Sequence, residues 1–285
     1  MSHIPLLLGA VAYDPKVVTI WDGFQQYFAE RGLAFDYILY TTYERQVEAH
    51  FAGHIDVAWN SPLAWLQSER LGGMLGRRAE AICMRDSDRD LTSVVIARNN
   101  DAIRNAADLK GRRVAVGAKD SPQATLIPLY FLAQQGLEPY RDFEVIEYDT
   151  LRGKHGDHIG GERDAARALL RSECDAACMI DSNHLLFIQE GTLPSGATRS
   201  IAQTGLYDHC NFTVLDNAPA EPVTRFRDLL LEMSYSDSKV RRLLDLEGLK
   251  RWLPGRTEGY KLLSEAVAKF NYLEAFVSSV AGRCA

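Results

Sequence analysis

The chain has 285 residues, of which 46% are hydrophobic and 25% are charged, a composition typical of a globular protein long enough for two domains. Its net charge of −6 at pH 7 argues against a surface that binds nucleic acid or an anionic membrane. The five cysteines have irregular spacings that match no zinc-binding pattern, so we expect small buried thiols.

The first apolar run, Ile4–Ala10, is too short to cross a membrane, and no basic segment precedes it as in a signal peptide. It predicts a β-strand instead. The chain as given is therefore expected to be cytoplasmic, or periplasmic if it is the processed form of an exported protein.

Strands and amphipathic helices alternate along the first ninety residues, which predicts a parallel or mixed sheet covered by helices. The predicted strands after Ile4–Ala10 cover residues 34–40, 55–59 and 79–84. The predicted helices cover residues 17–30, 42–51 and 63–71.

A second α/β run begins near residue 108, and its key segment is Arg112–Gly136. Arg112–Val116 predicts a buried strand, and Asp120 or Ser121 is a suitable N-cap for the following helix. A strand that leads into a helix N-terminus offers unpaired N–H groups and a positive dipole end, which suits an anion. The alternative is an ordinary cap that serves only its own helix.

Further elements are expected after this helix, and the last of them are helices only. The expected strands cover residues 143–148, 175–180 and 211–215, and the expected helices cover residues 160–171, 182–189, 223–233, 238–244 and 260–271.

Two strand-like segments, Leu91–Ala97 and Cys210–Leu215, connect the two α/β runs. This pattern predicts an α/β fold of two lobes, each a mostly parallel sheet flanked by helices, with a ligand cleft between the lobes. The expected lobes are residues 1–92 with 208–285 and residues 93–207, joined by a two-segment hinge.

Polar side chains follow several of the predicted strands, and ligands of open α/β sheets bind at the carboxyl ends of strands. The candidate ligand contacts are Tyr13, Asp14, Asn60, Ser61, Ser121, Gln123, Arg163 and Asp181. Ser121 would hold an anionic group, whereas Asp14 and Asp181 would hold an amine or a hydroxyl. Arg163 lies at the start of the predicted helix before Asp175 rather than after a strand; it would offer a bidentate contact to an anion, the alternative being a solvent-facing residue of the first turn.

Two histidine-containing segments are candidates for chemistry. His155 and His158 share a polar loop and are weak candidates for a metal site, the alternative being a flexible loop. His209 and Cys210 lie near the second crossover, where a thiolate nucleophile is conceivable and a buried structural cysteine is the alternative. Because neighbouring residues on a strand point to opposite faces, we expect these two side chains not to pair. The candidate catalytic residues are thus Cys210, His209 and His158, and no cofactor is predicted.

Three segments, Ile55–Leu66, Asp108–Thr125 and Glu162–Ser182, resemble the solute-binding proteins of phosphate/phosphonate-type ABC importers, in the right order. The resemblance implies a type II periplasmic-binding-protein fold that closes on a ligand. In that family the turn at Ser121 usually carries consecutive hydroxyls that hold the phosphonate. Here Pro122, Gln123 and Ala124 follow, which favours a weaker anion, a carboxylate or a neutral polar group.

The resemblance predicts a solute-binding protein for a small polar or anionic molecule, with an ABC permease as partner if the chain is exported. The alternative is a cytosolic enzyme on the same fold, with lyase- or hydrolase-type chemistry based on Cys210 or a histidine-bound metal. Neither nucleic-acid binding nor membrane insertion is expected.

Overall fold

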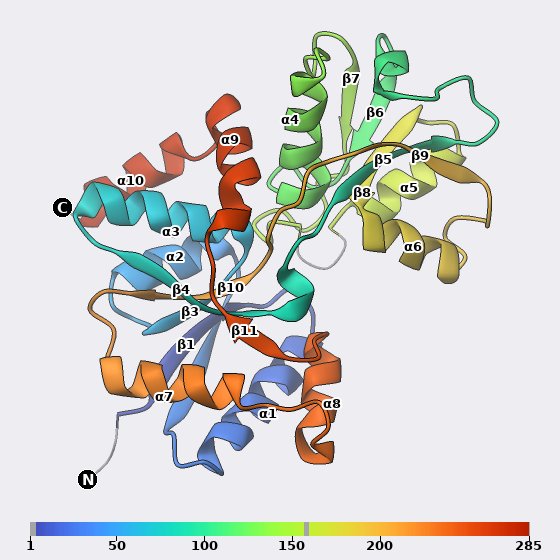
Figure 1. The fold of residues 1–285 in the computed structure, drawn as a ribbon. Helices are drawn as coiled ribbons and strands as arrows, with labels where there is room; N and C mark the ends of the chain where they lie inside the picture. The colour runs from blue at the N-terminus through green and yellow to red at the C-terminus, as the bar shows by residue number, and fades with distance from the viewer. Residues whose placement is uncertain (1–3, 157–159, 285) are drawn as a thin grey trace. The chain divides into compact units, whose positions relative to one another are not determined.

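The computed structural model describes residues 4–156 and 160–284, which form two α/β units (Figure 1). Unit 1 comprises residues 1–89, 208–260 and 273–285, and unit 2 comprises residues 90–207 and 261–272. None of the helices in these described ranges combines the length and the apolar character that a membrane span needs.

In the described residues, the sheet of unit 1 has six strands in the order β11-β4-β10-β3-β1-β2. Their bounds are β1 Leu6–Val11, β2 Phe35–Tyr40, β3 Val57–Asn60, β4 Ala79–Arg85, β10 Asn211–Leu215 and β11 Trp252–Pro254. β1 pairs in parallel with β2 and β3, whereas β10 is antiparallel to both of its neighbours, β3 and β4.

Helices cover both faces of this sheet (Figure 1). They are α1 Lys16–Ala29, α2 Tyr43–Phe51, α3 Pro62–Leu75, α7 Ala220–Leu231, α8 Ser238–Glu247 and α10 Glu274–Cys284, with short 3₁₀ turns at Asp86–Asp88 and Glu258–Tyr260. Phe212 of β10 is central to an aromatic core, because its ring lies 4.6 Å from Trp59 and 5.1 Å from Phe226, centroid to centroid. This core anchors β10 in the middle of the sheet.

The sheet of unit 2 has the order β7-β6-β8-β5-β9. Its strands are β5 Ser93–Arg98, β6 Arg113–Val116, β7 Glu144–Glu147, β8 Ala176–Ile180 and β9 Thr198–Gln203. Its helices are α4 Ile127–Gln134, α5 Glu162–Leu170, α6 Asp181–Gln189 and α9 Lys261–Lys269, with a 3₁₀ turn at Ala106–Leu109. β5 is antiparallel to β8 and β9, while β6 is parallel to β7 and β8.

The predicted fold class is confirmed: each unit is a sheet with most strands in one direction, flanked by helices. Both predicted crossover segments are strands, β5 and β10, and each enters its sheet antiparallel to its neighbours. The predicted helix over residues 120–136 is divided, because Pro122–Leu126 forms a π-helical turn in which the Ile127 N–H donates to the Pro122 carbonyl. The α-helix begins only after that turn.

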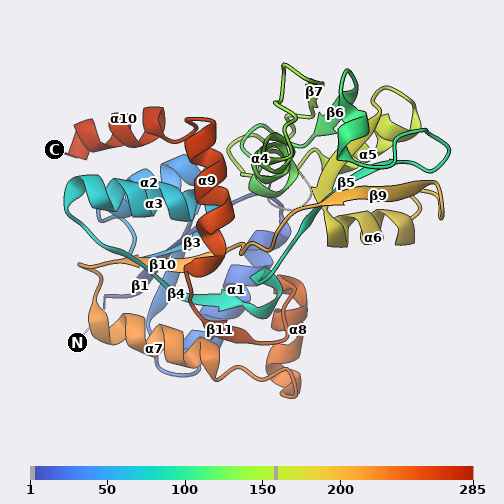
Figure 2. The same cartoon turned by 45° about the horizontal axis from the view of Figure 1, so that its top comes forward.

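One predicted boundary differs from the structure. Residues 208–285 are expected in one lobe, yet Lys261–Tyr272 packs with unit 2, where α9 lies beside α4 (Figure 2). The Tyr130 hydroxyl donates to Glu265 at 3.3 Å, and the Lys269 ammonium lies 2.9 Å from Glu138. Phe270 also packs against the apolar core of this unit. These contacts hold the segment on unit 2.

Candidate functional site

In unit 1, the carboxyl ends of β1 and β3 and the start of β10 lie at one edge of the sheet. The register shows this directly, because Asn211, the first residue of β10, pairs with Asn60, the last residue of β3. His209 and Cys210 precede Asn211 and therefore lie just outside the end of β3. This edge is where a ligand of an α/β sheet is expected.

Of the candidate residues at this edge, Asp14 is exposed and Tyr13 half-buried. The Asp14 carboxylate accepts the Lys16 N–H at 2.9 Å and so supports the start of α1. Ser61 is the N-cap of α3, its hydroxyl accepting the Ala64 N–H at 3.1 Å.

Asn60 is buried and its side-chain amide is engaged inside the unit. Its carbonyl oxygen accepts the Gln46 amide at 2.9 Å, and its own amide donates to the Thr213 hydroxyl at 2.9 Å. The side chain therefore ties α2, β3 and β10 together, a structural use that sequence reasoning does not foresee.

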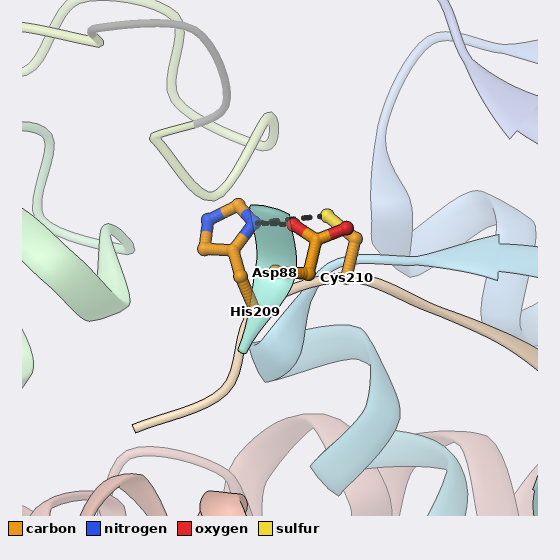
Figure 3. Close-up of side chains that lie close together, drawn as sticks. All are labelled: Asp88, His209 and Cys210. Carbon is orange, nitrogen blue, oxygen red and sulfur yellow. Dashed lines mark hydrogen bonds and ion pairs between the residues drawn. The ribbon is translucent and has the colours of Figure 1, made fainter. Parts of the chain in front are cut away.

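Asp88, His209 and Cys210 form a buried cluster at the same edge (Figure 3). His209 Nδ1 lies 3.1 Å from Cys210 Sγ and 3.3 Å from Asp88 Oδ1. Arg85 binds Asp88 through two bonds, the second of which, from Nη2 to Oδ1, measures 2.8 Å, and it also lies 3.2 Å from Glu247. Burial alone would raise the pKa of Asp88, but Arg85 and His209 hold it at about 2.

The expectation that His209 and Cys210 do not pair is wrong. The alternation of side chains applies within a strand, and β10 begins only at Asn211, so the two preceding residues are free to point to the same side. The same nitrogen, Nδ1, faces both Cys210 and Asp88. A catalytic triad instead needs one ring nitrogen for the nucleophile and the other for the carboxylate. The arrangement is therefore not a triad.

The three ligand atoms of this cluster lie within 4.8 Å of one another, a spacing that would suit a metal ion. However, both Asp88 oxygens accept bonds from Arg85, whose positive charge repels a cation. The donor set therefore fits a hydrogen-bonded ion cluster better than a metal site.

In unit 2, Ser121 and Gln123 lie at the end of β6 and are buried. The Ser121 hydroxyl accepts the Ala124 N–H at 3.1 Å, so of the two predicted N-cap residues, Asp120 and Ser121, it is Ser121 that caps the turn. The Gln123 side-chain amide donates to the Gly156 carbonyl at 2.6 Å, and its backbone carbonyl accepts the Ser93 hydroxyl at 2.5 Å. Gln123 Oε1 is buried and has no hydrogen-bond partner in the described part of the chain.

The loop that contains His155 folds over this turn. Gly156 lies so close to Ser121 that a Cβ at residue 156 would come within 2.2 Å of the serine hydroxyl. His155 is buried with a left-handed backbone, at φ 53°, and no metal cluster among the described residues includes it. His158 lies outside the described residues.

Asp181 follows β8 and is half-buried. It accepts the Ser182 N–H at 2.6 Å and the Thr92 hydroxyl at 2.9 Å. Arg163 is occupied differently from the predicted anion contact, because its guanidinium forms a bidentate pair with Glu190 at 2.9 and 3.0 Å. The guanidinium group that would suit an anionic ligand is therefore already paired with the carboxylate of Glu190, the C-cap residue of α6.

Four of the cysteines, Cys83, Cys174, Cys178 and Cys210, are free and buried, as predicted.

Sequence reasoning does not identify Arg85, Asp88 or Glu247 as part of the site. The charged segment Asp86–Asp90 has the composition of a solvated turn, and only the short Arg85–Asp88 spacing hints at an ion pair.

Comparison with known proteins identifies the family of this chain. Residues 10–260 match the sequence model of the family described as "ABC transporter, phosphonate, periplasmic substrate-binding protein". The chain belongs to this family. Membership confirms the predicted resemblance and supports solute binding over the enzyme alternative.

A related protein is the probable phosphite-binding protein PhnD1 of an ABC transporter from Prochlorococcus marinus (strain MIT 9301). It is 22% identical over 250 residues, which cover 82% of this chain and 78% of PhnD1. The structure of PhnD1 with methylphosphonate aligns with a TM-score of 0.69 and 18% identity, covering 93% of this chain and 98% of PhnD1.

The aliphatic sulphonate-binding protein SsuA of Escherichia coli also has this fold. It aligns with a TM-score of 0.60 and 17% identity, over 97% of this chain and 94% of SsuA. These likenesses establish the type II periplasmic-binding-protein fold for the family member described here.

Proposed function

We propose that this chain is the receptor of an ABC importer, which binds a small polar anion in the periplasm and delivers it to a permease. Family membership supports a small-molecule ligand and a permease partner. The observation that carries the ligand assignment is the turn after β6, where the Ser121 hydroxyl caps the π-helical turn. A hydroxyl and backbone N–H groups at such a turn suit an anionic oxygen.

The contacts at this turn favour a singly charged ligand over a dianion. Pro122 has no N–H, the Ser121 N–H donates to the Ala118 carbonyl, and the Ala124 N–H donates to the Ser121 hydroxyl. Few donors remain to balance two negative charges. The related proteins are described as binding phosphite or aliphatic sulphonates and as holding methylphosphonate, so a sulfonate, a carboxylate or a phosphonate monoanion is the preferred ligand class.

The remaining contacts proposed for the ligand are Tyr13, Asp14, Ser61, Gln123 and Asp181. The carboxylates would accept hydrogen bonds from a hydroxyl or amine on the ligand. Closure of the two units on the ligand stays a prediction, as does their two-segment hinge.

Calorimetric titration with ethanesulfonate, methylphosphonate and propionate tests this function. Ser121→Ala is expected to weaken binding of the preferred probe by about 1–3 kcal/mol, because it leaves a ligand oxygen without a donor. Asn105→Ala, which removes the cap of the 3₁₀ turn at the amino end of β6, opposite the proposed ligand edge, is the control and should leave affinity unchanged. Unaltered affinity of a folded Ser121→Ala protein would remove Ser121 from the site.

A further inference from the structure

One nitrogen of the His209 ring is held by the protein and the other is not. Nδ1 contacts Asp88 and Cys210, whereas Nε2 lies on the far side of the ring (Figure 3). The side chain is 10% exposed, and Nε2 is buried with no hydrogen-bond partner in the described part of the chain. A buried polar atom without a partner carries a free-energy cost and requires an explanation.

The rest of His209 is fixed in place. Its N–H donates to the Asp88 carbonyl at 2.7 Å, and its own carbonyl accepts the Tyr260 hydroxyl at 2.7 Å. Asp88 is in turn held by Arg85, which also donates to the Glu247 carbonyl at 2.8 Å. This chain of contacts prepares the ring in one orientation before any ligand binds, as a preorganised recognition group requires.

The contact with Asp88 also favours one tautomer of the ring. Asp88 is an ionised carboxylate that can only accept hydrogen bonds, so its 3.3 Å contact with His209 Nδ1 favours the tautomer with the proton on that nitrogen. Nε2 then presents a lone pair. A group that satisfies it must donate a hydrogen bond.

We propose that His209 Nε2 accepts a hydrogen bond from a hydroxyl or amino group of the ligand, so that the receptor selects polar anions that carry a donor over simple alkyl anions. This inference rests on the proposed function and deepens it by naming the ligand class. Asp88 and Arg85 act as positioning residues that hold the ring and its tautomer.

Unit 2 supplies an independent observation in the same direction. The Gln123 amide group donates to the Gly156 carbonyl, which fixes its orientation and leaves Oε1 as a buried acceptor without a partner. Each unit therefore has, at its ligand-binding edge, a buried acceptor that a ligand donor would satisfy.

The test compares two matched ligands, ethanesulfonate and 2-hydroxyethanesulfonate, by calorimetry at about pH 8, where free imidazole is neutral. Sulfonates have no titrating proton in this range, so the pair differs only in the hydroxyl. We expect the hydroxylated ligand to bind about tenfold more tightly to the unaltered protein. Methylphosphonate and hydroxymethylphosphonate form a second matched pair for a receptor that prefers phosphonates.

His209→Phe keeps a ring but removes both nitrogens, and it should abolish the tenfold preference for the hydroxylated ligand. His209→Gln retains an acceptor and should preserve part of the preference. His54→Phe is the control, because His54 is exposed and lies outside the site, and it should leave the preference intact. Thermal melting of each variant confirms that it folds.

The outcomes separate the inference from the proposed function. Equal binding of matched ligands to the unaltered protein, or an undiminished preference in folded His209→Phe, would overturn the role of His209 and leave the receptor function standing. Failure of the unaltered protein to bind any probe at millimolar concentration would overturn the receptor function for this ligand class, and with it the inference.

Discussion

Units 1 and 2 have the same strand plan but use the equivalent edge differently. In each, four strands alternate with helices, and one strand, β10 or β5, inserts antiparallel beside the third, which is β3 or β8. In unit 1 the segment before the inserted strand contributes His209 and Cys210 to the buried cluster with Asp88, which follows β4. In unit 2 the polar residues are held by capping and loop contacts.

The difference shows how one topology supports two kinds of preorganisation. In unit 1, buried ions position a side chain, and ion pairs of this kind are costly to disrupt. In unit 2, backbone turns and glycines position the polar groups at the end of β6. Mutations should therefore have their largest effects through charge in unit 1 and through steric fit in unit 2.

The largest effect is expected from Arg85→Ala. It leaves Asp88 and Glu247, whose side chains are 3% and 5% exposed, without their cation. We expect the free energy of unfolding to fall by about 3–5 kcal/mol, measured by urea denaturation. The matched control in unit 2 is Arg171→Ala, which breaks an exposed pair with Glu173 and should cost less than about 1 kcal/mol. Similar losses in the free energy of unfolding for both variants would contradict the proposed difference between the buried ions of unit 1 and the exposed pair of unit 2.

A smaller effect is expected from pH acting on His50 in unit 1. Burial lowers the pKa of His50 from 6.5 to about 4, so the native state favours the neutral ring. The stability that this neutral ring allows is fully present above pH 6.5. As the pH falls from 6.5 towards 4, the free energy of unfolding decreases by about 3 kcal/mol in total, because the unfolded state gains a proton that the native state does not. His50→Leu should flatten the stability curve in that window, measured by denaturation at several pH values.

His184 of unit 2 serves as the comparison for this pH effect. Its ring lies 2.9 Å from the Thr198 hydroxyl, and burial lowers its pKa in the same direction. Because the ring is less buried than that of His50, His184→Leu should change the pH dependence less. An equal or larger change would show that burial does not set the effect.

The smallest effect is expected from Gly161→Ala in unit 2. A Cβ there would lie 2.1 Å from the Tyr148 carbonyl oxygen, and φ is 79°. Gly32→Ala in unit 1 has a similar φ of 76° but no atom within 4 Å of the added Cβ. Gly161→Ala should therefore cost about 1–3 kcal/mol more than Gly32→Ala in thermal denaturation, through overpacking. Equal losses of stability for the two variants would show that the positive φ angle alone, and not the steric contact, determines the effect.

Much of this fold could be predicted from the sequence, because its strands and helices have strong apolar periodicity. The elements that sequence reasoning misses lack that signal. β9 is largely half-exposed, β11 has three residues and ends in Pro254, and α10 follows an unmarked turn.

The candidate site was harder to predict than the fold, because its side chains depend on partners distant in sequence. Arg163 is paired with Glu190, and Asn60 is bonded to Thr213. The contact between His209 and Asp88 depends on the position of β10 beside β4, which no local pattern specifies. The N-cap, by contrast, is predicted to within one residue, Asp120 or Ser121, because a helix N-cap is a local feature; the structure has Ser121 there.

The insertion of β10 beside β4 also constrains the order in which the chain can fold as it is synthesised. Both partners of β4 in the sheet, β10 and β11, begin at Asn211 and Trp252, long after β4 has left the ribosome. β4 therefore remains an unpaired strand edge while the whole sheet of unit 2 is translated. The sheet of unit 2 can form first, and unit 1 is completed only when the chain returns to it.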